Sequence, residues 1–170
     1  MSSKHIHTFA IGDVHGRADL LKALLDEIVK KANRLIGTYR VIFLGDIIDR
    51  GPDSRKAMDL VAKTLVAVPG SRLILGNHDS YPLRIIEEVD RFRKQALLLH
   101  WISQMGGAAT LVSYGFNFEE ASLDSVAEVI DRDHIEVLRA AQHYVELEHH
   151  ILVHAGLPVW GQLESGGAIG

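Results

Sequence analysis

The chain has 170 residues, of which 47% are hydrophobic and 24% charged, and a formal net charge of −4. These values are typical of one globular domain, and the lack of a basic block argues against nucleic acid as the main partner. No cysteine is present, which excludes disulfides and thiolate chemistry. The first residues lack an apolar signal core, and no apolar run approaches the roughly 20 residues of a membrane helix. We therefore expect a cytoplasmic protein without a membrane partner.

Three successive strand–loop–helix units are predicted in the first part of the chain. Short apolar runs predict the strands, and apolar residues at helical spacing predict the helices. The expected strands are 5–11, 40–44 and 72–75, and the expected helices are 17–32, 54–66 and 82–101, the last capped by Ser80. The charge run 87–94 is interpreted as a solvated helix face. This alternation predicts an α/β fold with a parallel sheet and helices on its faces.

The second part of the chain is less regular. Helical patterns are expected over 123–143, followed by a pair of short strands at 144–147 and 151–153. Glycines are frequent in 159–170, and we expect a poorly ordered tail there, after a domain that spans 1–158.

Side chains that can bind metals follow four of the predicted strands. They are Asp13 and His15 after the first strand, Asp46 after the second, Asn77 after the third and His154 after the last. Carboxylate, imidazole and amide ligands together suit a divalent first-row metal such as Mn²⁺, Fe or Zn²⁺. Two such ions, about 3.5–4 Å apart, would clamp a phosphoryl group and hold a bridging hydroxide. We predict that Asp46 lies between two ions and binds both.

Each of these residues has a simpler explanation when it is taken alone. An Asp after a strand is more often a helix cap, and a single His is more often a structural side chain. Four glycine-flanked motifs at four strand exits are much less expected by chance. Taken together, they favour a metal site over the separate structural explanations. The histidines outside these motifs are interpreted as structural: His5, His7, His100, His134, His143, His149 and His150.

Four motifs together resemble the PPP family of metallophosphoesterases, over roughly residues 6 to 158. The motifs are Gly12-Asp13-Val14-His15-Gly16, Gly45-Asp46-Ile47-Ile48-Asp49-Arg50-Gly51, Gly76-Asn77-His78-Asp79 and His154-Ala155-Gly156. The resemblance implies a calcineurin-like fold, a β-sandwich flanked by helices. It also implies a metal-dependent phosphoric-monoester hydrolase, foremost a serine/threonine-type protein phosphatase acting on phosphoproteins or small phosphoesters. A diadenosine tetraphosphate hydrolase and a non-catalytic metal-binding fragment are the alternatives.

The resemblance also implies a dinuclear metal centre. Asp13 and His15 would bind the first ion, Asp46 would bridge, and Asn77 and His154 would bind the second. The expected cofactors are two divalent ions, foremost Mn²⁺, with Fe, Zn or Ni as alternatives.

The remaining motif residues would act on the substrate. His78 would be the general acid that protonates the leaving oxygen, and Asp49 would orient its imidazole. Arg50 would grip the phosphate with its planar guanidinium, and Asn77 would also contact the substrate.

The sequence departs from the family pattern after His154. No His follows it, whereas the family places another metal-binding His and a phosphate-binding Arg later in the chain. We therefore expect a C-terminally truncated chain with an incomplete second sheet, a weak second metal site and low activity.

The substrate signals conflict. Leu75 stands where protein phosphatases carry Arg, which favours the diadenosine tetraphosphatase branch, and Asp79 in place of Glu is typical of bacterial members. The sequence Asp49-Arg50-Gly51 matches the protein phosphatase form.

Overall fold

The parallel sheet is the centre of the fold. The computed structural model describes residues 5–119 and 128–156. Strands β1 (Ile6–Ile11), β2 (Thr38–Phe43) and β3 (Arg72–Leu73) are parallel and lie in the order β1-β2-β3. β1 and β2 pair in register from Ile6 opposite Thr38 to Ile11 opposite Phe43. Beyond β3, the backbone N–H of Leu75 donates to the carbonyl of Gln142, which continues the pairing outside the strand itself.

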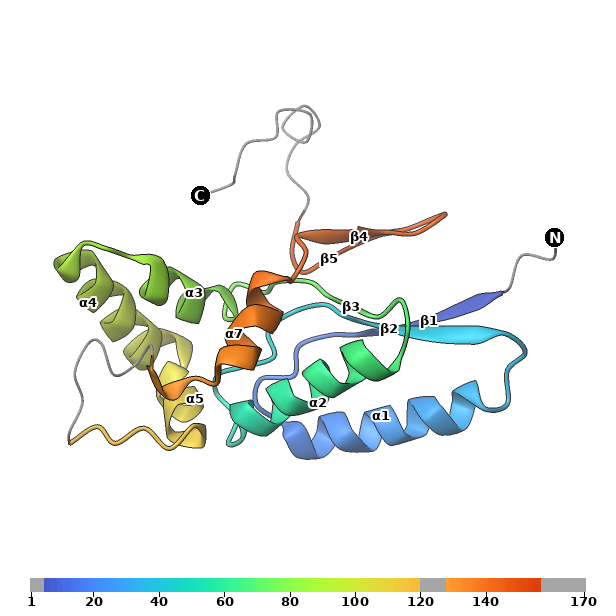
Figure 1. The fold of residues 1–170 in the computed structure, drawn as a ribbon, viewed down its shortest axis with the longest axis horizontal. Coiled ribbons are helices and arrows are strands. Elements are labelled where there is room, and N and C mark those ends of the chain that lie inside the picture. The colour runs from blue at the N-terminus through green and yellow to red at the C-terminus, as the bar shows by residue number, and fades with distance from the viewer. Residues whose placement is uncertain (1–4, 120–127, 157–170) are drawn as a thin grey trace, which may run out of the picture.

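Two different layers cover the faces of this sheet. Helices α1 (Ala18–Ala32) and α2 (Ser54–Ala67) pack on one face, and the antiparallel hairpin of β4 (Tyr144–Glu146) and β5 (Ile151–Val153) lies on the other (Figure 1). The expected α/β fold, a parallel sheet flanked by helices, is confirmed. In the described part of the chain, the second sheet has only these two strands.

Alternation along β2 sends successive side chains into different cores, as the period of a strand requires. Val41 and Phe43 lie in the large apolar core beneath α1 and α2. Ile42, between them, packs with Ile74 and Val145 in a smaller core beneath the hairpin. The apolar run that precedes the second motif is therefore buried on both faces of the sheet.

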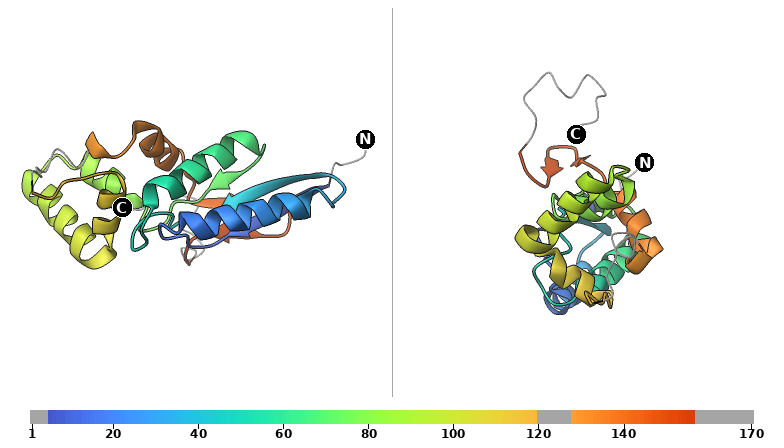
Figure 2. Two further views of the ribbon diagram at one scale, coloured as in Figure 1. Left: turned by 90° about the horizontal axis from the view of Figure 1, so that it is seen from below. Right: turned by 90° about the vertical axis from the view of Figure 1, so that its left-hand side faces the viewer.

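A group of short helices lies at the end of the molecule to which the carboxyl ends of the strands point (Figures 1 and 2). These are α3 (Ser80–Glu87), α4 (Arg91–His100), the π-helical turn η1 (Trp101–Met105), α5 (Gly107–Ser113) and α7 (Arg132–Arg139). They surround the loops that follow β1, β2 and β3, so the predicted site lies between the sheet and this helical layer.

Two helix expectations are wrong. The single helix expected over 82–101 is divided, because Glu88 has an extended backbone and Asp90 caps α4 by accepting the N–H of Arg93 at 2.9 Å. The charge run therefore spans a helix break instead of one helix face. Ser80 is the first residue of α3, not its cap, and its hydroxyl donates to the carbonyl of Asn77 at 2.7 Å.

Other expectations agree with the structure or fall outside it. Of the helical pattern over 123–143, the structure places α7 at 132–139, and residues 123–127 lie outside the described part. The tail expected over 159–170 also lies outside the described residues, so this expectation and the domain boundary remain predictions.

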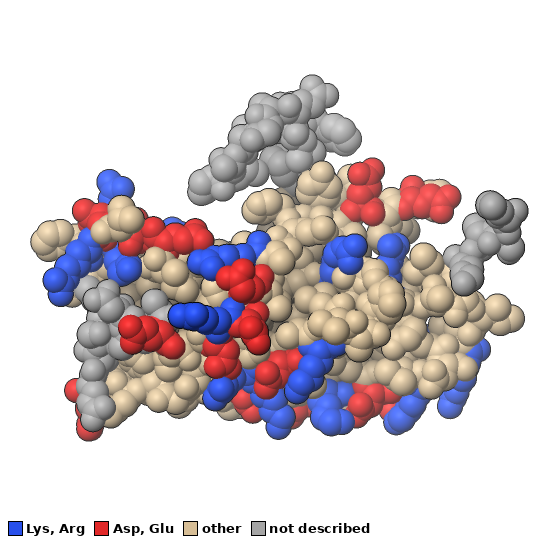
Figure 3. Space-filling model, in the orientation of Figure 1, with Lys and Arg blue, Asp and Glu red and all other residues tan. Residues whose placement is uncertain are grey.

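Charges of both signs are interspersed along α1, at the lower edge of the face shown in Figure 3. Lys22 pairs with Asp26 at 2.7 Å and Lys30 with Glu27 at 2.6 Å, one helical turn apart. Exposed pairs of this kind contribute little to stability, typically about 0–1 kcal/mol. Among the helices that the structure describes, none has both the length and the apolar composition needed to cross a membrane.

The smaller core can be tested with a pair of identical substitutions. Ile42→Ala should lower the free energy of unfolding by about 2–5 kcal/mol, because Ile42 is fully buried beneath the hairpin. Ile36→Ala should change it by less than about 0.5 kcal/mol, because Ile36 is 93% exposed. Urea denaturation followed by circular dichroism measures both, and equal losses would contradict the packing of the hairpin on the sheet.

Candidate metal centre

Backbone hydrogen bonds bring the loops after the three parallel strands together. The N–H groups of Val14 and His15 donate to the carbonyl of Asp46 at 3.0 and 2.9 Å. The backbone N–H of His78 donates to the Asp46 side chain, at 3.0 Å from Oδ1. Asp46 therefore joins the first loop through its main chain and the third loop through its carboxylate.

Four residues of these loops have left-handed backbone conformations that L residues rarely adopt. The φ angles are +44° at His15, +53° at Asp46, +75° at Asp49 and +67° at Arg50. Each such conformation costs of the order of 1–3 kcal/mol and persists only where surrounding contacts enforce it. Their concentration in two adjacent loops marks this end of the sheet as the candidate site.

Gly76 is required for the close approach of the third loop to the second. A Cβ at this position would collide with Oδ1 and the backbone nitrogen of Asp46. The glycine of the Gly-Asn-His-Asp motif thus leaves the room in which the Asp46 carboxylate lies.

Asp79 fastens the same two loops from the buried side. Its Oδ1 accepts the N–H groups of Ile47 and Ile48 at 2.8 and 3.3 Å, and its Oδ2 accepts that of Gly76 at 3.2 Å. Burial raises the pKa of Asp79 to about 6, the charge of Asp46 adds to the rise, and the three N–H donors oppose it. From the sequence, Asp79 was only a sign of bacterial family members, whereas in the structure it holds the second and third loops together.

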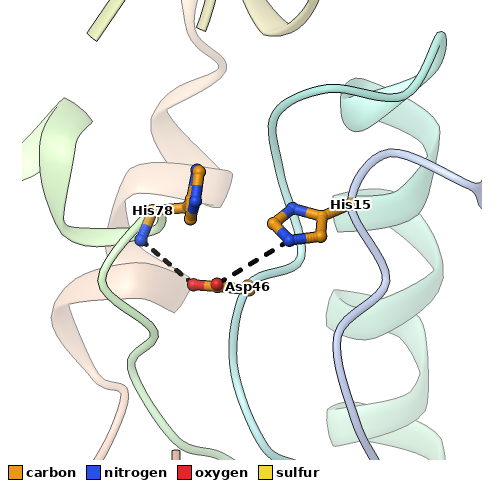
Figure 4. A group of neighbouring side chains, drawn as sticks. All are labelled: His15, Asp46 and His78. Carbon is orange, nitrogen blue, oxygen red and sulfur yellow. Dashed lines mark hydrogen bonds and ion pairs between the residues drawn. The ribbon is translucent and has the colours of Figure 1, made fainter. Parts of the chain in front are cut away.

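The first group of metal-binding atoms comes from the first two loops. His15 Nδ1 lies 3.0 Å from the carbonyl of Ile48, so Nδ1 carries the proton and donates it. The lone pair of Nε2 therefore faces the site. Nε2 lies 3.8 Å from Oδ2 of Asp13. It also lies 3.8 Å from Oδ2 of Asp46 (Figure 4). An imidazole fixed by a backbone carbonyl in this way is the usual arrangement of a metal-binding His.

The second group joins the third loop to the end of β5. His154 Nδ1 donates to the carbonyl of Leu44 at 2.8 Å, which directs Nε2 into the site. This Nε2 lies 3.0 Å from Oδ1 of Asn77 and 3.4 Å from Oδ1 of Asp46. An imidazole nitrogen, an amide oxygen and a carboxylate oxygen converge here, and these are ligand types that suit a divalent first-row cation.

The two groups share one carboxylate. Asp46 turns Oδ2 toward His15 and Oδ1 toward His154, so each of its oxygens belongs to a different group. Asp13, Asp46 and His154 also lie close enough to hold one ion together. The chemistry and convergence of these atoms fit divalent cations, and the structure brings all five of the expected metal ligands together.

His78 also lies near Asp46 and His15, at a spacing that would suit a metal ion (Figure 4). Both nitrogens of its ring, however, already have hydrogen-bond partners, Asp49 and Arg50. Nδ1 lies 2.8 Å from Oδ2 of Asp49, so it donates its proton to that carboxylate. Its link to Asp46 runs through the backbone N–H. The ring geometry is that of an imidazole held by a carboxylate rather than that of a metal ligand.

Arg50 connects the two imidazoles. Its Nη1 donates to Nε2 of His15 at 3.0 Å, and its Nη2 donates to Nε2 of His78 at 2.9 Å. Because a guanidinium only donates, both Nε2 atoms must be acceptors in this arrangement. The lone pair of His15 Nε2 serves one partner at a time, so Arg50 has to leave it when a cation binds there.

Sequence reasoning missed a set of buried partners of Asp49. These are the hydroxyls of Ser54 and Thr110 and the indole N–H of Trp101. The carbonyl of Gly106 supports the next residue, because it accepts the N–H of Arg50. Trp101 and Thr110 lie 52 and 61 positions after Asp49. Between them lies the glycine pair Gly106-Gly107, which by itself indicates only a break in a helix.

Two glycines of these loops provide a matched test of the site geometry. Gly76→Ala should weaken Mn²⁺ binding by about 10–100-fold, because the new Cβ displaces the carboxylate shared by both groups. Gly12→Ala should leave the dissociation constant unchanged within about twofold, because no atom lies within 4 Å of a Cβ there. Isothermal titration calorimetry measures both. Equal affinities in the two variants would show that Asp46 is not confined by Gly76.

Known phosphoesterases are similar to this chain over most of its length. Residues 6–164 match the model of the calcineurin-like phosphoesterase family. A symmetrical bis(5′-nucleosyl)-tetraphosphatase of Stutzerimonas stutzeri is 27% identical over 160 residues, which cover 92% of this chain and 46% of that protein. An enzyme of the same name from Dechloromonas aromatica is 33% identical over 107 residues, which cover 63% of this chain and 36% of the relative. This chain thus spans less than half the length of these relatives.

Solved structures agree in fold. The crystal structure of a candidate diadenosine tetraphosphatase matches with a TM-score of 0.54 at 22% identity, over 92% of this chain and 59% of the other. A cold-active protein-tyrosine phosphatase of a Shewanella species matches with a TM-score of 0.53 at 18% identity, over 93% of this chain and 45% of the other. The family model covers most of the chain, and the four motifs lie at the strand exits that the family resemblance implies. The chain therefore belongs to the calcineurin-like phosphoesterase family.

Proposed function

We propose that this protein is a metal-dependent hydrolase of dinucleoside polyphosphates. The observation that carries the chemistry is the shared carboxylate of Asp46, whose two oxygens face two separate groups of metal-binding atoms. Such a pair of sites is the arrangement with which dinuclear hydrolases stabilise the attacking and leaving oxygens of an in-line displacement at phosphorus.

We assign the ligands from the two groups. Asp13, His15 and Asp46 would hold the first ion, and Asp46, Asn77 and His154 the second, each group with three atoms from described residues. Divalent cations, foremost Mn²⁺, would supply positive charge that polarises the phosphoryl group and acidifies water.

We assign proton transfer to the leaving group to His78. Its Nδ1 keeps its proton and donates it to Asp49, which fixes the plane of the ring. For turnover Nε2 must carry a second proton, and it gives this proton to the leaving oxygen as the P–O bond breaks. The hydrogen bond from Arg50 to Nε2 has to be given up at that stage, since both groups are then donors.

Arg50 is then available to the substrate. Its planar guanidinium lies beside His15 of the first group and beside His78. Freed from these two imidazoles, it can bind two phosphate oxygens at once. Asn77 is exposed beside the second group, where its amide is also within reach of a substrate.

The choice of substrate class depends on the comparisons and on Leu75. Relatives that align with about nine-tenths of this chain are named symmetrical bis(5′-nucleosyl)-tetraphosphatases. Leu75 removes the phosphate-binding Arg that the resemblance gives to protein phosphatases. These points favour the dinucleoside polyphosphate alternative over the serine/threonine protein phosphatase expected first from the sequence. The Asp49-Arg50-Gly51 sequence keeps phosphomonoester hydrolysis, on phosphoproteins or small esters, as the second candidate.

The bridging role of Asp46 can be tested against Asp13 with the same substitution. Asp46→Asn should weaken binding of both Mn²⁺ ions, because one group loses its oxygen to an NH₂ and the other keeps only a neutral amide oxygen in place of a charged one. Asp13→Asn should weaken only one. The loss of activity in Asp46→Asn should exceed the about 10–100-fold expected for a residue that merely supports a ligand. Calorimetric stoichiometry and affinity distinguish the variants, and one intact site in Asp46→Asn would contradict a shared carboxylate.

The substrate class can be tested with Mn²⁺-loaded protein. We expect kcat/KM for diadenosine tetraphosphate to exceed that for a phosphoserine peptide and for p-nitrophenyl phosphate by at least about tenfold, a transition-state difference of about 1.4 kcal/mol. The reverse order would favour the second candidate. Two tightly bound ions with no turnover of any of these substrates would contradict a hydrolase and support a metal-binding module.

A further inference from the structure

We infer that Trp101 and Thr110 are positioning residues for the general acid, because they hold the carboxylate that holds His78. The inference rests on the proposed hydrolase function. Asp49 is fully buried and receives three side-chain donors. His78 Nδ1 lies 2.8 Å from its Oδ2, Thr110 Oγ1 2.7 Å from its Oδ1, and Trp101 Nε1 3.0 and 2.9 Å from its two oxygens.

The geometry leaves Asp49 a single orientation. The N–H of Trp101 is shared between the two carboxylate oxygens, so it lies on the axis of the group. Thr110 and His78 then bind one oxygen each. A carboxylate with donors on both oxygens and on its axis cannot rotate without losing one of them, and losing a donor to a buried charge is unfavourable. The plane of the His78 ring follows from that of Asp49.

The hydroxyl of Thr110 is fully used. A threonine hydroxyl has one proton, which goes to Asp49 Oδ1 at 2.7 Å. It therefore accepts from both of its other partners, the backbone N–H of Asp49 at 2.9 Å and the hydroxyl of Ser54 at 3.0 Å. Ser54 Oγ in turn accepts from the same N–H at 3.1 Å. Thr110 thus fixes the main chain and the side chain of Asp49 with one atom.

Trp101 is fixed as firmly as the group it binds. It is fully buried and begins the π-helical turn η1, and π-helical turns are frequent at functional sites. Gly107 packs directly on its indole, because a Cβ there would lie 2.5 Å from Cδ2 and Cε2 of the ring. The indole therefore has no room to tilt, and its N–H stays directed at Asp49.

The same segment also supports the left-handed backbone that places Asp49 and Arg50. The carbonyl of Gly106 accepts the N–H of Arg50 at 3.2 Å. Gly106 itself has φ of +86°, and a Cβ on it would lie 2.9 Å from the nitrogen of Arg50. Residues 101–110 thus contact the second motif through three kinds of groups: an indole, a hydroxyl and a backbone carbonyl. This segment therefore holds two residues against the helical layer: Asp49, which orients the general acid His78, and Arg50.

Leaving-group dependence separates a positioning role from a structural one. Phenolate is a poor leaving group that needs protonation, whereas 2,4-dinitrophenolate leaves readily without it. A residue that positions the acid should therefore matter for phenyl phosphate and little for 2,4-dinitrophenyl phosphate. A residue that only stabilises the fold or the metal loops should affect both esters equally.

The test compares kcat for the two esters with Mn²⁺-loaded protein. Thr110→Val and Trp101→Phe should lower kcat for phenyl phosphate by about 10–100-fold, part of the 10²–10⁴-fold that general acid catalysis contributes. Both should lower kcat for 2,4-dinitrophenyl phosphate by less than about threefold. Thr110→Ser, which keeps the hydroxyl, should retain the wild-type ratio. Thr64→Val, which removes a hydroxyl that bonds only to the carbonyl of Leu60 within α2, should leave both rates unchanged.

The outcomes are distinguishable. Equal losses with the two esters in Thr110→Val, or a Thr110→Ser variant as impaired as Thr110→Val, would overturn the inference and leave the proposed function intact. A wild-type protein that binds two ions but hydrolyses neither ester nor diadenosine tetraphosphate would overturn the proposed function, and the inference with it. Should Trp101→Phe fail to fold, the two Thr110 variants alone decide.

Discussion

The convergence of three loops on Asp46 is the constraint on which the rest of the structure depends. Its carbonyl accepts two N–H groups from the loop after β1, and its carboxylate accepts one from the loop after β3. The same carboxylate directs one oxygen at each group of metal-binding atoms. The residue that joins the loops is thus also the residue that the two groups share.

This arrangement stores strain, and the layers around the site compensate for it. The left-handed backbone at Asp46, Asp49 and Arg50 is unfavourable for each residue alone. Asp79, beneath the loops, binds three of their N–H groups. The segment with Trp101 binds Asp49 and Arg50 from the helical side. In the part of the chain that the structure describes, no buried side-chain polar atom is left without a partner. The site is rigid because its strained residues are held from both sides.

The sequence predicts the sheet well, for local reasons. Strands such as 40–44 are short apolar runs that end at glycines, and parallel strands bring their carboxyl ends to one edge. Asp13, Asp46 and Asn77 could therefore be predicted to meet although they are far apart in the chain. His154 follows β5 of the separate hairpin, so its place beside them depends on the packing of that hairpin on the sheet. His134 was interpreted as structural, and it is buried between the Tyr114 hydroxyl at 2.7 Å and Asp59 at 3.2 Å.

The remaining features depend on contacts that no local pattern encodes. The break near Asp90 was missed because Asp90 acts as a cap only once the preceding residues leave the helix. The support of Asp49 by Trp101 and Thr110 joins segments more than 50 positions apart, and nothing near Asp49 indicates it. Each partner alone looks like an ordinary core residue of a helix. Their role is visible only when the helical layer lies against the loops.

The central claim is that the two oxygens of Asp46 serve two different cations. Anomalous diffraction from crystals grown with Mn²⁺ tests it most directly. The account predicts two anomalous peaks, one bound by Asp13, His15 and Asp46 Oδ2, the other by Asp46 Oδ1, Asn77 and His154. A single peak, or two peaks of which only one contacts Asp46, would contradict it.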